Sequence, residues 1–296
     1  MWKTAAAAAA GAAAACLARS EYEKKALSVE SLSLVSGRLE ASRTFVFLSD
    51  LHSNEFGRDN CRLLEAIDDI APDAVLSGGD MMITKDGQAD LRVPLQLFRQ
   101  LAGKYPVYCG NGNHENRMLW RKDIYGSKYR HYKEALRSMG VVCLEDDSAW
   151  FGSDIRITGL DVDRRFYRKA LFYKLPPMTE EYLENKIGKK PAYEGMKPYF
   201  QILLAHSPLY FDSYAGWGAD LTLCGHFHGG TIRLPFLGGV MTPQYQFFLP
   251  CCAGSFQRGE SVMAVSRGLG THSINIRLNN RPQLMVLELK PAGTQG

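Results

Sequence analysis

The stretch VFLSDLHSNEFG, residues 46–57, places Asp50 and His52 directly after an apolar run. The run TFVFLSD, residues 44–50, indicates a buried strand that ends at Asp50. Residues two apart on a strand share a face, so we expect Asp50 and His52 to project in the same direction. A turn or a helix cap would also explain the Asp-x-His sequence, and only the rest of the chain can distinguish these interpretations.

The same arrangement, an apolar segment followed by polar residues, recurs four times. The segments are DAVLSGGD (73–80), PVYCGNGNHE (106–115), FQILLAHSP (200–208) and ADLTLCGHFHGG (219–230). Apolar residues at helical spacing occupy residues 60–70, 89–105 and 127–139, and the last of these helices leads to a strand at 141–146. Strands alternating with helices predict an α/β fold with a largely parallel first sheet. Ligands of such sheets gather beyond the carboxyl ends of the strands.

The second half of the chain has a different pattern. A strand at residues 154–161 precedes a basic, aromatic segment, residues 162–199. Short strands near the C-terminus, at residues 260–270, 272–278 and 283–289, are separated by turns and favour antiparallel pairing. Two sheets packed face to face with helices outside would accommodate both halves.

Composition describes an ordinary soluble globular protein. The 296 residues are 46% apolar and carry a net charge of +4, from 35 basic and 31 acidic residues. This charge is too small to indicate nucleic acid, and no nucleic-acid-binding module is recognisable. Seven cysteines without a CxxC pair support neither a disulfide framework nor a zinc ribbon, and the pattern assigns no role to Cys251 and Cys252.

The N-terminal segment, residues 1–25, stands apart from the rest. One lysine, an alanine-rich stretch and small residues before Cys16 resemble an export signal or anchor. The apolar part, residues 4–18, is shorter than the roughly 20 residues that span a bilayer. We expect the protein to associate with a membrane through this segment, and we expect the segment to take no part in the fold. Cleavage, lipidation of Cys16 and retention stay open, as does the membrane face; the alternative is a frayed alanine helix without a targeting role.

The polar residues at the predicted strand ends form one set. Its members are Asp50, His52, Asp80, Asn113, His114, His206, His226 and His228. Carboxylate, amide and imidazole groups suit divalent Mn, Fe, Co, Ni or Zn, and the absence of cysteine argues against a structural zinc site. The set is too large for one ion. Two ions about 3.5–4 Å apart that share a bridging carboxylate would use all of it.

Five short motifs, SDLH, GGD, GNHE, AHSP and GHFHGG, occur in an order that resembles the calcineurin-like metallophosphoesterases. The resemblance extends over about residues 45–289. The segments IRLPFLGG (232–239), VSRGLG (265–270) and INIRLNNRPQLMVLEL (274–289) resemble the membrane-associated bacterial branch of that family, whose members commonly begin with an export or anchor segment. The resemblance implies a four-layer αββα sandwich with two mixed sheets and a dinuclear metal site at the strand ends.

The resemblance also implies a role for each residue of the set. Asp50, His52 and His228 would hold the first ion, and Asn113, His206 and His226 the second. Asp80 would bridge the ions, with manganese the favoured metal. His114 would be catalytic, facing the scissile phosphate without binding metal. Asn113, His114 and His206 would contact the substrate.

The expected domain spans residues 40–292, with residues 162–199 as an insertion. We expect hydrolysis of a phosphomono- or phosphodiester by a metal-bridged hydroxide. His114 would either donate a proton to the leaving oxygen or stabilise charge. The alternatives are a pyrophosphatase acting on a nucleotide-linked lipid and a catalytically silent binding scaffold on the same fold. The physiological substrate, the native metal pair and the oligomeric state stay open.

The insertion is the segment where we expect substrate choice to reside. Its basic and aromatic residues would bind an anionic head group or rest on an anionic membrane surface or phospholipid. A solvated loop whose aromatic rings pack on the sandwich is the alternative. These residues are Arg164, Arg165, Phe166, Tyr167, Arg168, Lys169, Phe172, Tyr173, Lys174, Lys189, Lys190 and Lys197.

Overall fold

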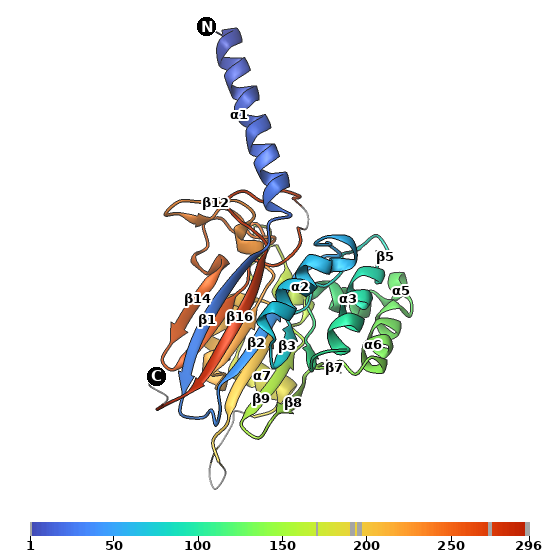
Figure 1. The fold of residues 1–296 in the computed structure, drawn as a ribbon, viewed down its shortest axis with the longest axis vertical. Coiled ribbons are helices and arrows are strands. Elements are labelled where there is room, and N and C mark those ends of the chain that lie inside the picture. The colour runs from blue at the N-terminus through green and yellow to red at the C-terminus, as the bar shows by residue number, and fades with distance from the viewer. Residues whose placement is uncertain (1, 170, 190–192, 194–196, 272–273, 294–296) are drawn as a thin grey trace.

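Two six-stranded sheets form the centre of the molecule (Figure 1). The computed structural model describes residues 2–169, 171–189, 193, 197–271 and 274–293. The first sheet has the order β1 (Ser28–Ser36), β16 (Gln283–Pro291), β2 (Arg43–Leu48), β3 (Ala74–Ser77), β6 (Val107–Cys109) and β7 (Val142–Cys143). The second has the order β14 (Gly254–Arg258), β15 (Ser261–Val265), β11 (Leu221–Cys224), β10 (Phe200–Ala205), β9 (Ile155–Leu160) and β8 (Asp147–Phe151).

Helices cover the outer face of each sheet. The first sheet is covered by α2 (Cys61–Ile70), α3 (Arg92–Ala102), α4 (Asn113–Trp120), α5 (Lys122–Tyr125) and α6 (Lys128–Ser138). The second is covered by α7 (Glu180–Ile187) and α8 (Phe211–Trp217). Two short hairpins lie outside the sheets: β4 (Thr84–Lys85) with β5 (Gln88–Ala89), and β12 (Arg233–Leu234) with β13 (Gly238–Gly239). The chain also forms single 3₁₀ turns, which are η1 (Arg58–Asn60), η2 (Arg164–Tyr167), η3 (Pro208–Tyr210), η4 (His228–Gly230) and η5 (Pro250–Cys252).

The alternation of side chains along the strands produces these layers. On β2, Phe45 and Phe47 enter the core between the sheets, whereas Val46 and Leu48 pack under the helices of the first sheet. Strand β10 alternates in the same way between the central core and the helices of the second sheet. Each central strand therefore has two apolar faces, because both of its faces are buried. The expected αββα sandwich is confirmed.

The parallel strands of both sheets place the site at their carboxyl ends. Strands β2, β3, β6 and β7 run parallel in the first sheet, as do β9, β10, β11 and β15 in the second. The chain leaves β2, β3, β6, β10 and β11 at their carboxyl ends and enters the five polar segments that the sequence analysis singled out. Both sheets thus direct their polar loops to one place.

Strand β1 was not predicted from the sequence and precedes residue 40, the expected start of the domain. It pairs parallel with β16 from Ser28↔Gln283 to Ser36↔Pro291. Its sequence, SVESLSLVS, mixes polar and apolar residues without strict alternation, and every residue is partly or fully exposed. Because its apolar content is low, β1 resembles a polar lead-in until its partner strand is known.

The C-terminal strands only partly follow the antiparallel expectation. Strand β15 pairs antiparallel with β14 but parallel with β11, and β16 pairs antiparallel with β2 but parallel with β1. The strand predicted at residues 272–278 is wrong for residues 274–278, where Leu278 makes one isolated bridge with Ile232. The N–H of Arg277 there donates to the side chain of Ser20, which takes the place of a neighbouring strand. Residues 272–273 lie outside the described residues.

Helix α1 (Trp2–Glu23) projects from the body of the molecule (Figure 1). Residues 2–19 are exposed, whereas Ser20 and Glu23 are buried. The last turn of α1 therefore belongs to the folded body, and only the alanine-rich part stands outside it. Among the residues that the structure describes, no helix combines the length and hydrophobicity that crossing a bilayer requires.

We expect Phe47→Ala to destabilise the fold, because this ring is fully buried between the sheets. Removing a buried phenylalanine ring costs about 3–5 kcal/mol. Val35→Ala, on a β1 side chain that is 68% exposed, is the control and should change the free energy of unfolding by less than about 0.5 kcal/mol. Urea denaturation measures both, and equal losses of stability would contradict the central position of Phe47.

Candidate metal centre

Left-handed backbone conformations direct Asp50 and His52 toward the site. Strand β2 ends at Leu48, and Asp50 and His52 lie beyond it with φ of 51° and 49°. The expectation that they share one face of a strand is therefore wrong, although both side chains belong to one group. The Asp50 N–H donates to Gly79 O (2.9 Å), and the His52 N–H donates to Asp80 O (3.1 Å). These bonds tie the loop after β2 to the loop after β3.

Left-handed backbone recurs at the site. Asp80, His226 and His228 also have positive φ, of 55°, 68° and 48°. Such a conformation costs an L-residue roughly 1–2 kcal/mol, so the surrounding contacts must stabilise it. Close packing adds a second constraint, because a Cβ on Gly225 would lie 2.2 Å from Asp50 Oδ2. Only glycine therefore permits the loop of His226 to approach Asp50 this closely.

The structure brings together and buries all eight residues of the predicted set. These are Asp50, His52, Asp80, Asn113, His114, His206, His226 and His228. Three groups within the set could each hold an ion: Asp50 with His52 and His228, Asp80 with His206 and His226, and His52 with Asp80 and His114. The first two groups match the division into two ion sites that the resemblance implies. The assignment of each residue as a ligand stays a prediction.

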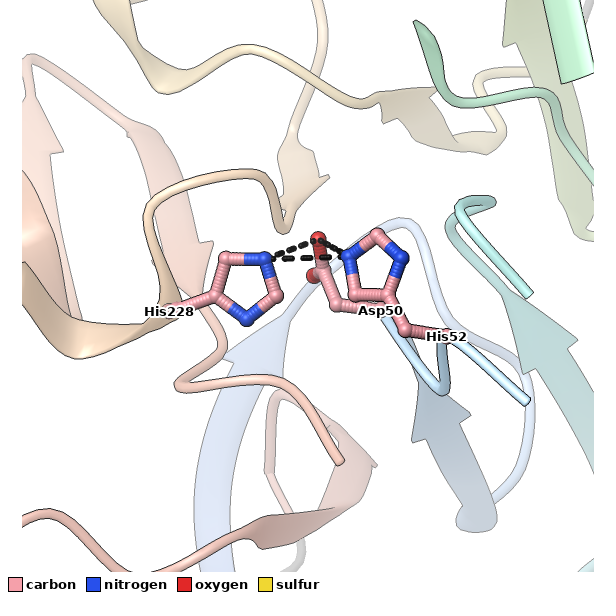
Figure 2. A group of neighbouring side chains, drawn as sticks. All are labelled: Asp50, His52 and His228. Atoms are coloured by element: carbon pink, nitrogen blue, oxygen red, sulfur yellow. Dashed lines mark hydrogen bonds and ion pairs between the residues drawn. The ribbon is translucent and has the colours of Figure 1, made fainter. Parts of the chain in front are cut away.

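The first group converges on a small space (Figure 2). His52 Nε2 lies 3.1 Å from His228 Nε2, and Asp50 Oδ1 lies 3.5 Å from His228 Nε2 and 3.9 Å from His52 Nε2. Ligand atoms bound about 2.0–2.2 Å from one ion lie roughly 3.0–3.5 Å from one another. Two of the three spacings fall in this range and the third exceeds it by about 0.4 Å, so a small movement of His52 or Asp50 would fit the group to a divalent cation.

The second group surrounds the carboxylate of Asp80. Asp80 Oδ2 lies 3.1 Å from His206 Nε2. The amide group of Asn113 directs one end at Asp80 Oδ2 (3.3 Å) and at His226 Nδ1 (2.8 Å). Either the NH₂ of the amide faces these atoms, or its oxygen does and a cation lies among them. The second arrangement is what a metal site requires, so the Asn113 side chain also fits an ion.

Burial and charge act together on the two carboxylates. Burial raises the pKa of Asp50 to about 6. Burial also opposes ionisation of Asp80, yet the nearby His206 and His114 hold its pKa well below the usual range. Burial would lower the pKa of His206, but Asp80 raises it to about 10. The carboxylates thus require a neighbouring positive charge, which protons on imidazole or bound cations can supply.

Backbone carbonyls orient two of the imidazoles. His206 Nδ1 lies 2.8 Å from Gly78 O, and His228 Nδ1 lies 3.1 Å from Gly270 O. In each pair Nδ1–H donates to the carbonyl oxygen, so a neutral ring presents the lone pair of Nε2 on the side of the carboxylates. Such outer contacts fix the tautomer of metal-binding histidines.

The tautomer of His114 follows from a different contact. The backbone N–H of Thr84 donates to His114 Nδ1 (2.8 Å), so neutral His114 carries its proton on Nε2. That nitrogen lies 4.0 Å from Asp80 Oδ2, and His114 is one of the residues that line the cavity described below. His114 is therefore placed to donate a proton into the site. The geometry also groups it with His52 and Asp80, so its exclusion from metal binding stays a prediction.

Glu115 is a supporting residue that the sequence analysis did not assign. Its buried carboxylate accepts from the backbone N–H groups of Asp80 (2.8 Å), Met81 (2.9 Å) and Gly112 (3.0 Å). Burial, with the negative charge of Asp80, raises the pKa of Glu115. The glutamate three residues after Gly112 fits the capping-box position at the start of α4, a signal that could have identified it.

A second support connects α1 to the site. Asn280 Nδ2 donates to His228 O (2.7 Å), and the N–H of Asn280 donates to Glu23 Oε2 (2.8 Å). The guanidinium of Arg277 donates to Gly270 O (2.6 Å), the same oxygen that His228 Nδ1 contacts. The last turn of α1 thus helps to position the backbone of His228. Isolated Asn, Arg and Glu residues carry no sequence pattern, so they could not be found in advance.

A cavity of about 350 Å³ opens over the site. Asp80 is the single carboxylate among its lining residues, whereas five of the lining side chains are cationic. In the described part of the chain no ion pair occupies Arg117, Arg164, Arg168 or Lys169, while Arg121 pairs with Asp123. The lining residues are His52, Asp80, Asn113, His114, Arg117, Trp120, Arg121, Arg164, Tyr167, Arg168, Lys169, His226, His228, Pro243 and Gln244.

We expect Asn280→Ala to weaken metal binding at the group of Asp50, because it removes the donor to His228 O. Loss of an outer contact typically lowers metal affinity about 10–100-fold. Asn185→Ala, at an exposed position of α7, is the control. Calorimetric titration with Mn²⁺ measures both variants. Unchanged affinity in Asn280→Ala would show that the asparagine does not position His228.

Comparisons with known proteins match most of this chain. The sequence profile of the calcineurin-like phosphoesterase family matches residues 43–230. The uncharacterized metallophosphoesterase YkuE of Bacillus subtilis (strain 168) is 27% identical over 256 residues, which cover 83% of this chain and 78% of YkuE. The phosphodiesterase YaeI of Escherichia coli (strain K12) is 27% identical over 250 residues, or 82% of this chain and 81% of YaeI. A further uncharacterized metallophosphoesterase of B. subtilis (strain 168), YkoQ, is 22% identical over 240 residues, or 80% of each chain. The chain therefore belongs to the calcineurin-like phosphoesterase family.

Proposed function

We propose that the protein is a metal-dependent phosphoesterase that hydrolyses a phosphomono- or phosphodiester at a two-ion site. The position of Asp80 is the observation that carries this proposal. Its Oδ2 lies 3.1 Å from His206 Nε2 in one donor group and 3.9 Å from His52 Nε2 in the other. A carboxylate between two donor groups is the arrangement that a bridging ligand needs.

The two donor groups define which residues would hold each ion. Asp50, His52 and His228 would hold one, Asn113, His206 and His226 the other, and Asp80 both. The carboxylate and amide oxygens suit manganese, the ion that we favour, whereas the imidazoles also suit Fe, Ni and Zn. When bound, the ions would supply an activated water nucleophile and offset the charge of the phosphoryl group.

The protein's own residues would bind and protonate the substrate. The Nε2–H of His114 would donate to the leaving oxygen, because the contact with Thr84 leaves that proton on the nitrogen 4.0 Å from Asp80 Oδ2. Asn113 and His206 would lie against the phosphoryl group. The cations of the cavity wall, such as Arg117 and Arg164, would attract and orient an anionic ester, since guanidinium groups match phosphate oxygens.

We also propose that the protein associates with a membrane through its N-terminus. The exposed, alanine-rich part of α1 supports this proposal, because it projects away from the folded body (Figure 1). The motif resemblance to an anchored bacterial branch points the same way. The buried Ser20 and Glu23 set a limit, since a chain that begins after them would lose contacts with the site.

We expect the pure protein to bind close to two divalent ions and Asp80→Asn to lose most activity, because both donor groups share this carboxylate. Asp212→Asn, at a side chain that is 82% exposed, is the control. Elemental analysis and hydrolysis of bis(p-nitrophenyl) phosphate measure the two effects. One ion or none in active protein would contradict the two-ion site.

We expect His114→Ala to retain metal and to lose about 10²–10⁴-fold in kcat, the usual contribution of one positioned proton donor. His131→Ala, at an exposed histidine on α6, is the matched control. Metal content and turnover are measured on both variants. Loss of metal from His114→Ala would instead make His114 a ligand, and normal turnover would remove it from the chemistry.

We expect the full chain to fractionate with membranes and a chain of residues 18–296 to remain in the soluble fraction. The shorter chain lacks the alanine-rich part of α1 but keeps Ser20 and Glu23, so its fold and site should be intact. Fractionation of expressing cells, followed by activity assays of each fraction, measures the outcome. Equal distribution of both chains would show that the alanine-rich helix has no targeting role.

A further inference from the structure

Exposed apolar side chains are concentrated in two short segments. Among the described residues, eight of the 18 exposed large apolar side chains lie within residues 171–173 and 234–248. Clusters of this kind on a soluble fold mark interaction sites. The eight are Leu171, Phe172, Tyr173, Leu234, Phe236, Leu237, Phe247 and Phe248.

The two segments are joined to each other at the cavity over the metal centre. Lys169 Nζ donates to the Tyr245 hydroxyl (2.8 Å), and Gln244 Nε2 donates to Arg168 O (2.8 Å). The rings of Phe172 and Tyr245 lie 6.3 Å apart. Arg168, Lys169 and Gln244 themselves line the cavity. Both segments are therefore attached to residues of the cavity wall, and we call the eight exposed apolar residues the apolar rim.

The backbone holds parts of the rim in strained conformations. Phe236 and Phe248 have φ of 63° and 51°, a region that L-residues other than Asn and Asp rarely occupy. The side chain of Phe236 is nevertheless fully exposed, at 108%. Strain that gains no burial within the fold indicates that these side chains serve a contact outside it.

The part of the rim around β12 lies at the same end of the molecule as the N-terminal helix (Figure 1). Strand β12, which contains Leu234 and precedes Phe236, lies beside the base of α1 (Figure 1). Arg233 in β12 and Lys25 after α1 add positive charge at this end, whereas Lys24 pairs with Glu21 (2.7 Å). Aromatic and aliphatic tips combined with cations are typical of surfaces that bind anionic lipid head groups.

We propose that the apolar rim docks on an anionic lipid surface, and that the cavity behind it receives the phosphorylated head group of a lipid. The docking surface does not depend on the proposed hydrolysis. The lipid substrate rests on that proposed function. The charge of the cavity favours lipid over a second copy of the chain. In a symmetric dimer, the cations Arg164, Arg168 and Lys169 of each copy would face one another and repel.

Vesicle binding of the full chain tests the docking surface. The test variant is Phe236→Asn with Phe248→Asn, because asparagine tolerates positive φ and the fold should persist. The control is Val35→Thr with Trp150→Thr. These side chains are 68% and 52% exposed and lie on β1 and β8, outside the rim. Flotation uses phosphatidylcholine vesicles with and without phosphatidylglycerol, and circular dichroism checks each fold.

We expect wild type and control to bind the anionic vesicles more tightly than the neutral ones. The rim variant should lose roughly 10-fold or more in partition, since each buried aromatic ring contributes several methylene equivalents. Equal partition of rim variant and wild type would overturn the docking surface, and so would failure of wild type to bind. Self-association of wild type that the rim variant abolishes would assign the surface to a second copy and also overturn the proposal.

Hydrolysis separates the substrate from the docking surface. Wild type should cleave phosphatidic acid in vesicles with a higher kcat/KM than glycerol phosphate in solution, and the rim variant should lose this advantage. Its hydrolysis of soluble bis(p-nitrophenyl) phosphate should be unchanged. If soluble glycerol phosphate is cleaved equally well, the lipid substrate is wrong. If wild type binds vesicles but hydrolyses none of these esters with any added divalent metal, the proposed function fails and the docking surface stands.

Discussion

The structure depends on two buried carboxylates that need a positive charge beside them. Asp50 and Asp80 are both withdrawn from water, and each approaches His206 Nε2, at 3.8 and 3.1 Å. Burying an unpaired carboxylate costs several kcal/mol, so five histidines and an amide around the pair are intelligible as the surroundings of cations. If the cluster had only a structural role, apolar side chains could replace these polar groups at little cost in stability.

The fold supplies the means of placing these groups together. Parallel strands of two sheets deliver polar loops to a shared edge, and left-handed backbone at Asp50 and Asp80 directs the side chains inward. Gly225 allows the loop from the second sheet to reach Asp50. Glu115 holds the Asp80 loop by three hydrogen bonds, and Glu23 connects the last turn of α1 to the loop that supports His228. The centre is thus supported from both sheets and from the N-terminal helix.

The sequence predicted the layers and the members of the site, because both follow from short-range patterns. Apolar runs mark central strands, and polar residues at their ends converge once the strands are parallel. It did not predict β1, whose serine-rich sequence lacks a regular apolar pattern, or the loop at 274–278, which the side chain of Ser20 in α1 contacts. The left-handed turns at Asp50 and His52 were also missed, since strand alternation gave a plausible but wrong reason for their shared direction. Contacts of Glu23 and Asn280 depend on tertiary packing alone.

The central claim is that the buried cluster is a site for two divalent ions. Crystals soaked in manganese chloride, with diffraction data recorded at the manganese absorption edge, test it most directly. The account predicts two anomalous peaks, one beside Asp50, His52 and His228 and one beside Asn113, His206 and His226, with Asp80 contacting both. A single peak, or peaks only at surface carboxylates, would contradict it.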